Sequence, residues 1–399
     1  MYSMRKLPRL IIVFLLTVWL LGGHELFPGP ATAPKENIVL AASPAKPEAA
    51  QTEAAKVEAP ILSSLSGAER NRVAGLIQAA RQERALDWLD AVVVPASAIK
   101  FEEAFKRRCG LPDLKINHQR LSTGEVTTRV QEEVKAGRVT VDIFAVAAPR
   151  LFYALKEVGA LYQYDSREHK YYESAKKAGL TFEPGYWLSP VAYTFSPVTN
   201  PKFYARDIAS WYDILDPKLK GKIYMPNAGG TEAPLYHFIG LRQVLPRSYF
   251  EQIAALSPVM GGGSSVEATQ KLASGEQWVS ITNAFRLIQV VVQTGVIMKA
   301  FYPKEGTPML GHAYAILSKA PHANAAKLFL DFLFSEEGQT LYTALEGTIA
   351  ARDGLKVPDY VRRYSPPLAT IKSIPIDWKH LDDNALNSAR EEWRQIFKR

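Results

Sequence analysis

Serine and threonine side chains stand where two predicted helices begin, and hydroxyls in that position could bind an anion. Ser122 and Thr123 open a helix predicted to run through Val134, and Thr231 precedes a helix predicted from about residue 232 to 245. The unpaired N–H groups of a first helical turn and the helix dipole both favour negative charge. The same hydroxyls could serve only as helix caps, so an anion site and a structural cap both stay open.

Residue types that carry catalysis are present but are not arranged for it. The seven histidines are dispersed, with no His-x-x-x-His pair on one helical face, and no Gly-x-Ser-x-Gly nucleophile motif occurs. Neighbouring carboxylates such as Glu102 and Glu103 point to different faces of a predicted helix. Cys109 is the only cysteine, so no disulfide, cysteine-rich zinc site or iron–sulfur cluster can form within the chain. We expect no catalytic residues, no metal ligands, no cofactor and no enzymatic activity.

The elements that would position these residues alternate between strands and helices. A capping pair, Ser66 and Glu69, predicts the start of a long leading helix, and the apolar run at 91–95 is the first expected buried strand. Further strands are expected at 114–117 and 141–146, each separated from the next by a helical pattern. Strands that alternate with helices imply right-handed crossovers and a parallel sheet, with ligand loops at the carboxyl ends of the strands.

Length and composition set limits on the partners. A chain of 399 residues that is 47% hydrophobic is longer than the roughly 250–300 residues that one core supports, so two lobes are expected. The net charge is +8 and the pI is about 9.2, yet the basic residues are scattered and form no run that interleaves with aromatics. We therefore expect no nucleic-acid partner.

The N-terminus has the layout of a secretory signal peptide. Basic residues precede an uncharged run from Leu10 to Leu21, which is shorter than the roughly 20 residues that span a bilayer. Cleavage is expected after Ala33 or Ala42, and an uncleaved anchor is the alternative. The segment from residue 34 to about 62 is rich in Ala, Pro, Glu and Lys, so it is predicted to be a disordered linker.

One segment and several shorter ones resemble a known family. WYDILDPKLKGKIYMP (211–226) is similar to a segment of type II extracellular solute-binding proteins of bacterial ABC importers, the family that includes ferric-iron binders. The resemblance continues in the same order through the segments EEVKAGRVTVDIF (132–144), LKEVGALYQYDS (155–166), ASGEQWVSITN (273–283), AFYPKEGTP (300–308) and AAKLFLDFLFSEEGQ (325–339).

The resemblance implies an α/β fold with two lobes of parallel or mixed sheet, joined by two crossing strands. The boundaries that follow are a signal peptide or anchor at 1–33, the linker at 34–62, lobe 1 at 63–189 and 309–357, lobe 2 at 190–308, and a helical tail packed on the lobes at 358–399. It also implies an exported, periplasmic monomer that captures a small solute between its lobes. The implied partners are a membrane permease and an ATPase, with the membrane reached only through the permease or an uncleaved N-terminal segment.

A binder of this kind holds its ligand between loops of both lobes and closes around it by a hinge motion. The expected ligand contacts are loop residues at strand ends, in lobe 1 Ser97, Ser122 and Thr123, and in lobe 2 Tyr193, Asn227, Gly229, Gly230, Thr231, Asn283, Arg286 and Tyr302.

The ferric binders hold their metal with two adjacent tyrosines, which fall here on Phe285 and Arg286. Phe offers no oxygen, and an arginine stays protonated and repels a cation. The doublet Tyr171–Tyr172 lies in a charged stretch that is expected on the surface, so it is not a substitute. We therefore expect Arg286 to bind a carboxylate, phosphonate or phosphate group of a small organic ligand. A structural ion pair of Arg286, ferric binding through other residues, and a membrane-anchored sensor are the alternatives.

Overall fold

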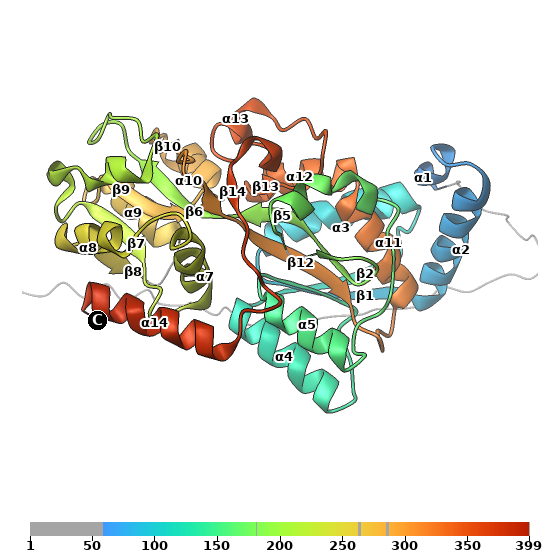
Figure 1. The fold of residues 1–399 in the computed structure, drawn as a ribbon. Helices are drawn as coiled ribbons and strands as arrows, with labels where there is room; N and C mark the ends of the chain where they lie inside the picture. Colours follow the sequence, from blue (N-terminus) through green and yellow to red (C-terminus); the bar gives the residue numbers. More distant parts are fainter. Residues whose placement is uncertain (1–58, 181, 262–264, 285–286, 399) are drawn as a thin grey trace, which may run out of the picture. The chain divides into compact units, whose positions relative to one another are not determined.

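Two β-sheets, each covered by helices, organise the computed structural model, which describes residues 59–180, 182–261, 265–284 and 287–398 (Figure 1). The first sheet has the order β13-β5-β12-β3-β1-β2, with β4 pairing to β5, and the second has the order β10-β6-β9-β7-β8. We call the first sheet with its helices lobe 1 and the second with its helices lobe 2. The mixed α/β architecture with two lobes confirms the fold class that the sequence predicts.

Lobe 1 is a three-layer arrangement. Its strands are β1 (Ala85–Asp90), β2 (Lys115–Arg120), β3 (Ile143–Val146), β4 (Phe182–Glu183), β5 (Trp187–Tyr193), β12 (Leu310–Ile316) and β13 (Ile349–Ala350). One face packs on α3 (Pro95–Cys109), α11 (Ala323–Phe334) and α12 (Glu336–Glu346), and the other face packs on α4 (Thr123–Lys135) and α5 (Pro149–Glu157). The shorter η1 (His169–Tyr171) and α6 (Glu173–Lys177) complete this lobe. Parallel pairing of β1 with β2 and β3 brings the ends of these strands to one edge of the sheet.

Lobe 2 repeats this layering around a smaller sheet. Its strands are β6 (Phe195–Thr199), β7 (Ile223–Pro226), β8 (Val259–Gly261), β9 (Val279–Asn283) and β10 (Lys299–Ala300). Its helices are η2 (Trp211–Leu215), η3 (Pro217–Leu219), α7 (Glu232–Leu241), α8 (Arg247–Ala255), α9 (Ser265–Ser274) and α10 (Leu287–Thr294). The segment 211–226 that carries the family resemblance forms η2, η3 and the buried strand β7.

Two connections join the lobes. The segment 187–197, expected to be one extended strand, is two strands that change sheet at Thr194, between β5 and β6. The return runs through β11 (Thr307–Pro308) into β12. The Thr307 hydroxyl lies 2.7 Å from the Thr194 hydroxyl, which donates to the carbonyl of Pro308 at 2.6 Å. Both oxygens are buried, so these bonds hold the two connections together.

The C-terminal segment returns along both lobes. It contains α13 (Asp359–Arg362), η4 (Leu368–Thr370), β14 (Ser373–Ile374), which pairs with β11, and α14 (Asp383–Phe397). Helix α14 packs on lobe 2, where the Trp393 ring meets the ring of Phe238 edge-on with centroids 5.1 Å apart. The apolar residues of α14 are therefore buried against lobe 2.

Two helices precede the first strand, α1 (Pro60–Ser63) and α2 (Gly67–Glu83). Ser66 is the N-cap residue of α2, but the expected capping box is wrong because the Ser66 side chain makes no cap bond. Glu69 instead accepts two hydrogen bonds from Arg72. Arg72 also donates to Asp331 of α11 at 3.0 Å and thereby ties α2 to lobe 1.

Within the part of the chain that the structure describes, no helix is both long and apolar enough to span a bilayer. The expected signal segment and linker, residues 1–58, lie outside the described residues.

Candidate functional site

The lobe 1 side of the junction is built on a buried carboxylate. β1 ends at Asp90, whose side chain is completely buried and accepts from the backbone N–H groups of Val92 and Val93 at 2.6 and 2.8 Å. His312 Nε2 lies 3.1 Å from the same carboxylate, and the Tyr314 hydroxyl donates to it at 2.6 Å. β3 runs between β1 and β12, and the small side chain of Ala145 stands opposite both Asp90 and Tyr314 in the register. We infer that this small residue leaves room for the contact across the strand.

This cluster fixes a loop and is not suited to proton transfer. Burial by itself raises the pKa of Asp90, but His312, the Tyr314 hydroxyl and the Val93 N–H outweigh burial and lower the pKa below its usual value. Burial beside the Asp90 carboxylate raises the pKa of Tyr314. The Asp90 oxygens thus already have donors. Glu346 accepts from the N–H of Val94 at 3.1 Å, so two carboxylates hold the loop that leads into α3.

Two of the expected ligand residues, Tyr193 and Tyr302, meet where the lobes join, and a third, Asn283, lies nearby at the end of β9. Tyr193 and Tyr302 line one narrow gap together with Thr194, Ala284, Gly347, Ile349 and Ser365, and we call these residues the seam. The gap holds about 170 Å³ between atoms but has no room for the centre of a water molecule. Asn283 directly precedes Ala284 and pairs with Phe195 in the sheet.

The polar side chains at and beside the seam differ in their hydrogen-bond partners. Burial raises the pKa values of Tyr193 and Tyr302. The Tyr302 hydroxyl donates to the carbonyl of Tyr364 at 2.6 Å, so it holds the C-terminal segment against the seam. Asn283 is 6% exposed, and its Oδ1 has no hydrogen-bond partner within the described part of the chain. A buried acceptor without a partner carries a desolvation cost of about 1–3 kcal/mol, which a ligand donor would offset.

The expected residues at helix N-termini act locally. Ser122 and Glu125 form a capping box at α4, with Ser122 Oγ accepting from the Glu125 N–H at 3.3 Å. Thr231 is the N-cap residue of α7, yet its hydroxyl donates to the carbonyl of Asn227 and makes no cap bond. The Asn227 side chain accepts from the N–H of Gly229 at 2.9 Å.

The other expected contacts do not join the seam group. Ser97 is buried in the first turn of α3, and Thr123 opens α4. Across the described segments, no hydrogen bond links Ser97, Ser122 or Thr123 to the seam. Gly230 follows Gly229 in the loop before α7. Arg286, together with Phe285, lies outside the described residues. The ligand roles of all these residues therefore stay predictions.

The expectation that Tyr171 and Tyr172 both lie on the surface is wrong for Tyr172. Its side chain is fully buried, and its hydroxyl donates to the carbonyl of Phe334 at 2.8 Å, because the turn between η1 and α6 packs against the end of α11. Tyr171 is 39% exposed.

Sequence reasoning missed several residues of the junction. Asp90 could have been found, because a carboxylate at the end of a buried strand is unusual. Glu346, Gly347 and Ser365 gave no local signal, since only packing of the C-terminal third brings them to the seam.

A second carboxylate cluster has a structural explanation. Asp87, Asp142 and His322 place their ligand atoms within 4.8 Å of one another. Asp142 accepts from the N–H of Asp87, from the N–H of His322 and, at 2.8 Å, from His322 Nδ1. Burial raises the pKa of Asp142. The cluster fastens the start of α11 to β1 and β3. Its β1 member, Asp87, lies three residues before Asp90 and therefore on the other face of the sheet.

Comparisons with known proteins agree with this architecture. The model of a family described as bacterial extracellular solute-binding protein matches residues 100–364. No curated protein matches the chain. Iron-bound HitA from Pseudomonas aeruginosa has a similar structure, with a TM-score of 0.62, 18% identity, and coverage of 78% of this chain and 99% of that one.

Two further solved structures are similar. AfuA from Actinobacillus pleuropneumoniae, with fructose-6-phosphate bound, gives a TM-score of 0.62 at 17% identity and covers 79% of this chain and 99% of its own. A substrate-binding protein of an ABC transporter from Agrobacterium tumefaciens gives 0.61 at 15% identity, with 78% and 94% covered. At such identities the likeness shows a shared fold.

Proposed function

Because this chain belongs to the bacterial extracellular solute-binding proteins, the substrate-binding components of ABC importers, we propose that it captures a small organic anion at the seam. The gap there has no room for a water molecule as the lobes lie in this structure, so the lobes would part at the seam to admit the solute. Family members bind and deliver their solutes without transforming them, and the donor-saturated Asp90 is in keeping with a non-enzymatic site. A carboxylate, phosphonate or phosphorylated compound is the ligand class that we favour.

The observation that carries the proposal is the buried amide of Asn283. It lies at the end of β9, three residues before Arg286, with an oxygen that lacks a partner in the described segments. An amide can donate to an oxyanion and accept from a ligand hydroxyl, so it suits a polar organic molecule. Phe285 offers a ferric ion no oxygen, and of the two tyrosines at the seam, Tyr302 already donates its hydroxyl to the carbonyl of Tyr364.

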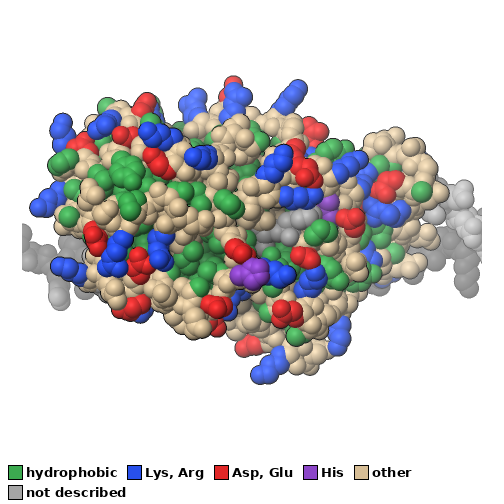
Figure 2. Space-filling model, viewed as in Figure 1, with side chains coloured by type: hydrophobic (Ala, Val, Ile, Leu, Met, Phe, Trp, Pro, Cys, Tyr) green, Lys and Arg blue, Asp and Glu red, His purple; other side chains and the backbone are tan. Residues whose placement is uncertain are grey.

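The similar structures support both ligand classes. AfuA holds fructose-6-phosphate, which supports a phosphorylated ligand, and HitA holds iron, which keeps ferric binding through other oxygen ligands as the second candidate. Figure 2 shows basic and acidic side chains interspersed on the face in view, rather than one broad basic patch. This distribution fits a small solute better than a polyanion such as nucleic acid.

Export and delivery complete the proposal. The uncharged run before residue 22 would direct the chain across the membrane, after which the bound solute would be passed to a permease that an ATPase drives. N-terminal sequencing of protein from the periplasm distinguishes a cleaved chain from one that keeps its N-terminal segment. A start near Pro34 or Ser43 supports a diffusible carrier, whereas an intact N-terminus supports a membrane-anchored sensor.

Thermal unfolding with a ligand panel tests the ligand class. We expect sugar phosphates, phosphonates or carboxylates to raise the unfolding temperature, because a ligand that binds only the folded state stabilises it. Arg286→Gln should remove this protection, and Arg247→Gln, on the surface of α8, should retain it. Protection by ferric salts alone, with no response to any organic anion, would overturn the proposal.

A further inference from the structure

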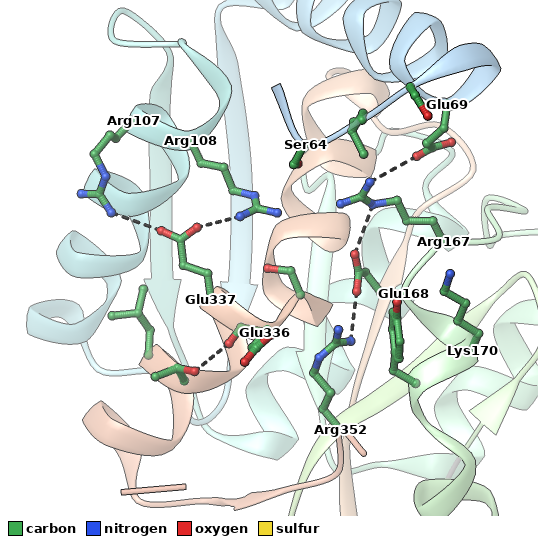
Figure 3. A pocket seen from close by; sticks show the side chains of 16 residues that line it. Ser64, Glu69, Arg107, Arg108, Arg167, Glu168, Lys170, Glu336, Glu337 and Arg352 are labelled. Atoms are coloured by element: carbon green, nitrogen blue, oxygen red, sulfur yellow. Dashed lines mark hydrogen bonds and ion pairs between the residues drawn. The ribbon is translucent and has the colours of Figure 1, made fainter. Parts of the chain in front are cut away.

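A second pocket lies where the N-terminal helices pack onto lobe 1 (Figure 3). The turn between α1 and α2 forms one side of it, with Ser64, Leu65, Ser66 and Glu69. These residues precede position 100, where the family match begins. The pocket is open to solvent on one side and has a volume of about 1050 Å³, slightly above the roughly 300–1,000 Å³ typical of small-molecule sites.

Five basic side chains line this pocket from opposite sides. Arg107 and Arg108, in the last turn of α3, both bind the carboxylate of Glu337, at 3.2 and 2.8 Å. On the other side, Arg167 and Arg352 both bind the carboxylate of Glu168, at 3.1 and 3.0 Å. Each of these two carboxylates is therefore shared between two guanidinium groups (Figure 3).

Sharing leaves hydrogen-bond donors to spare. A guanidinium carries five N–H donors, and one carboxylate cannot satisfy two of these groups. The fifth basic residue, Lys170, makes no ion pair with any described residue, and its ammonium stands over the Tyr171 ring at 5.0 Å. The pocket also contains Glu69 and Glu336, and Glu69 is bound by two nitrogens of Arg72 and lies 3.8 Å from Arg167. The lining thus has five basic and four acidic side chains, a small excess of positive charge.

The arginines are held in place before any ligand arrives. The Arg352 side chain is 10% exposed and Glu168 is 6% exposed, and Arg352 also donates to the carbonyl of Phe334 and stacks on Tyr171. The side chains of Arg108 and Arg167 are 22% and 25% exposed. Each lines the pocket while its ion pair, with Glu337 or Glu168, holds it in place. Fixed donors lose little entropy on binding, which favours affinity.

We propose that this pocket binds a small oxyanion, of the phosphate, sulfate or polycarboxylate type, separately from the solute at the seam. Two pairs of guanidinium groups on facing walls match the paired oxygens of such an anion. The same chemistry is offered by a free anion and by the phosphate of a lipid headgroup. The proposal does not depend on what binds at the seam.

Calorimetric titration of the full chain with inorganic phosphate, sulfate and citrate tests it, against sodium chloride of equal ionic strength. Arg108→Gln together with Lys170→Gln removes one cation from each wall without touching the more buried Arg352. We expect this double variant to bind the anions at least about tenfold more weakly than the unaltered chain, since each charge-assisted hydrogen bond contributes strongly to affinity. Hydrogen exchange should show protection by the anion around residues 64–72 and 335–341 in the unaltered chain only.

The matched control removes two paired cations from lobe 2, with Arg247→Gln and Lys299→Gln. It should bind the anions like the unaltered chain, and so should Arg286→Gln, which separates this site from the seam. Vesicles with and without phosphatidylglycerol identify the source. Binding to anionic vesicles that the pocket variant loses indicates a headgroup, and binding of soluble anions alone indicates a free solute. No response beyond sodium chloride, or equal binding by the pocket variant and its control, would overturn the proposal.

Discussion

Two histidines of the core have different surroundings. His312 lies 3.1 Å from the Asp90 carboxylate. His237, in α7, lies among aromatic rings, with centroids 5.5 Å from Phe195 and 5.9 Å from Trp211, and its Nε2 has no hydrogen-bond partner among the described residues. Burial lowers the pKa of His237 to about 3, and a hydrogen bond to the Phe195 backbone offsets only part of that shift. The imidazole is therefore buried in its neutral form.

This burial makes stability depend on pH. Because the unfolded imidazole gains a proton near 6.5 and the folded one resists until about 3, acidification favours the unfolded chain. Between about pH 7 and pH 5, His237 should cost about 2 kcal/mol of unfolding free energy. Denaturant titrations of the unaltered chain and of His237→Phe at both pH values measure the difference. Equal pH slopes for the two proteins would contradict this assignment.

At the scale of elements, α7 packs closely on the connection between the lobes. A Cβ on Gly240 of α7 would lie 2.4 Å from Cγ and 2.7 Å from Cβ of Pro308 in β11. Pro308 also accepts the Thr194 hydrogen bond at the first connection. The missing side chain at position 240 thus lets a lobe 2 helix pack directly on the return connection, which the Thr194 hydrogen bond ties to the first connection.

Gly240→Ala should therefore lower the unfolding free energy, by about 1–3 kcal/mol, because overpacking forces the helix and the strand apart. Gly75→Ala is the matched control, since Gly75 is exposed on α2 and its added Cβ would contact nothing. There the helix propensity of alanine should raise stability by about 0.5–1 kcal/mol. Thermal and urea unfolding of both variants check the opposite signs, and changes of the same sign would contradict the packing argument.

At the scale of the whole binding unit, one ion pair links lobe 1 to the helix on lobe 2. Arg150, at the start of α5, lies 2.6 Å from Asp383 in the first turn of α14, and this hydrogen bond raises the pKa of Arg150. The side chains are 39% and 77% exposed, so solvent screens the pair. The ion pair is therefore a weak stabilising contact between the lobes.

Asp383→Asn should weaken ligand binding at the seam by about two- to fivefold at low salt, because the tie favours the arrangement in which the two lobes meet. The effect should disappear at high salt, where exposed charges are screened. Asp359→Asn removes an equally close pair that lies within one helix, Arg362–Asp359, so its affinity should not change. Calorimetry with the ligand identified from the panel gives the comparison. A loss that persists in high salt would count against an electrostatic tie.

The sequence by itself determined the family, the two-lobed α/β class and most of the elements, because these depend on local signals. The expected first strand at 91–95 is wrong, since the first strand is β1 (Ala85–Asp90) and residues 91–94 form the loop into α3. Apolar runs, proline and glycine stops, and caps such as Ser122 act over a few residues, and each can be recognised without knowing the rest of the chain. The segment 211–226 carried the resemblance for the same reason.

Only the tertiary structure decided which side chains meet. Asp90 and Tyr314 lie more than two hundred positions apart and meet across β3, where the small Ala145 stands opposite both. Tyr172 is buried because the turn before α6 packs at the end of α11. The arginines of the second pocket converge because two glutamates distant in sequence, Glu337 and Glu168, each bind two of them. Such contacts depend on the packing of distant elements and on side-chain volume, and no short stretch of sequence contains that information.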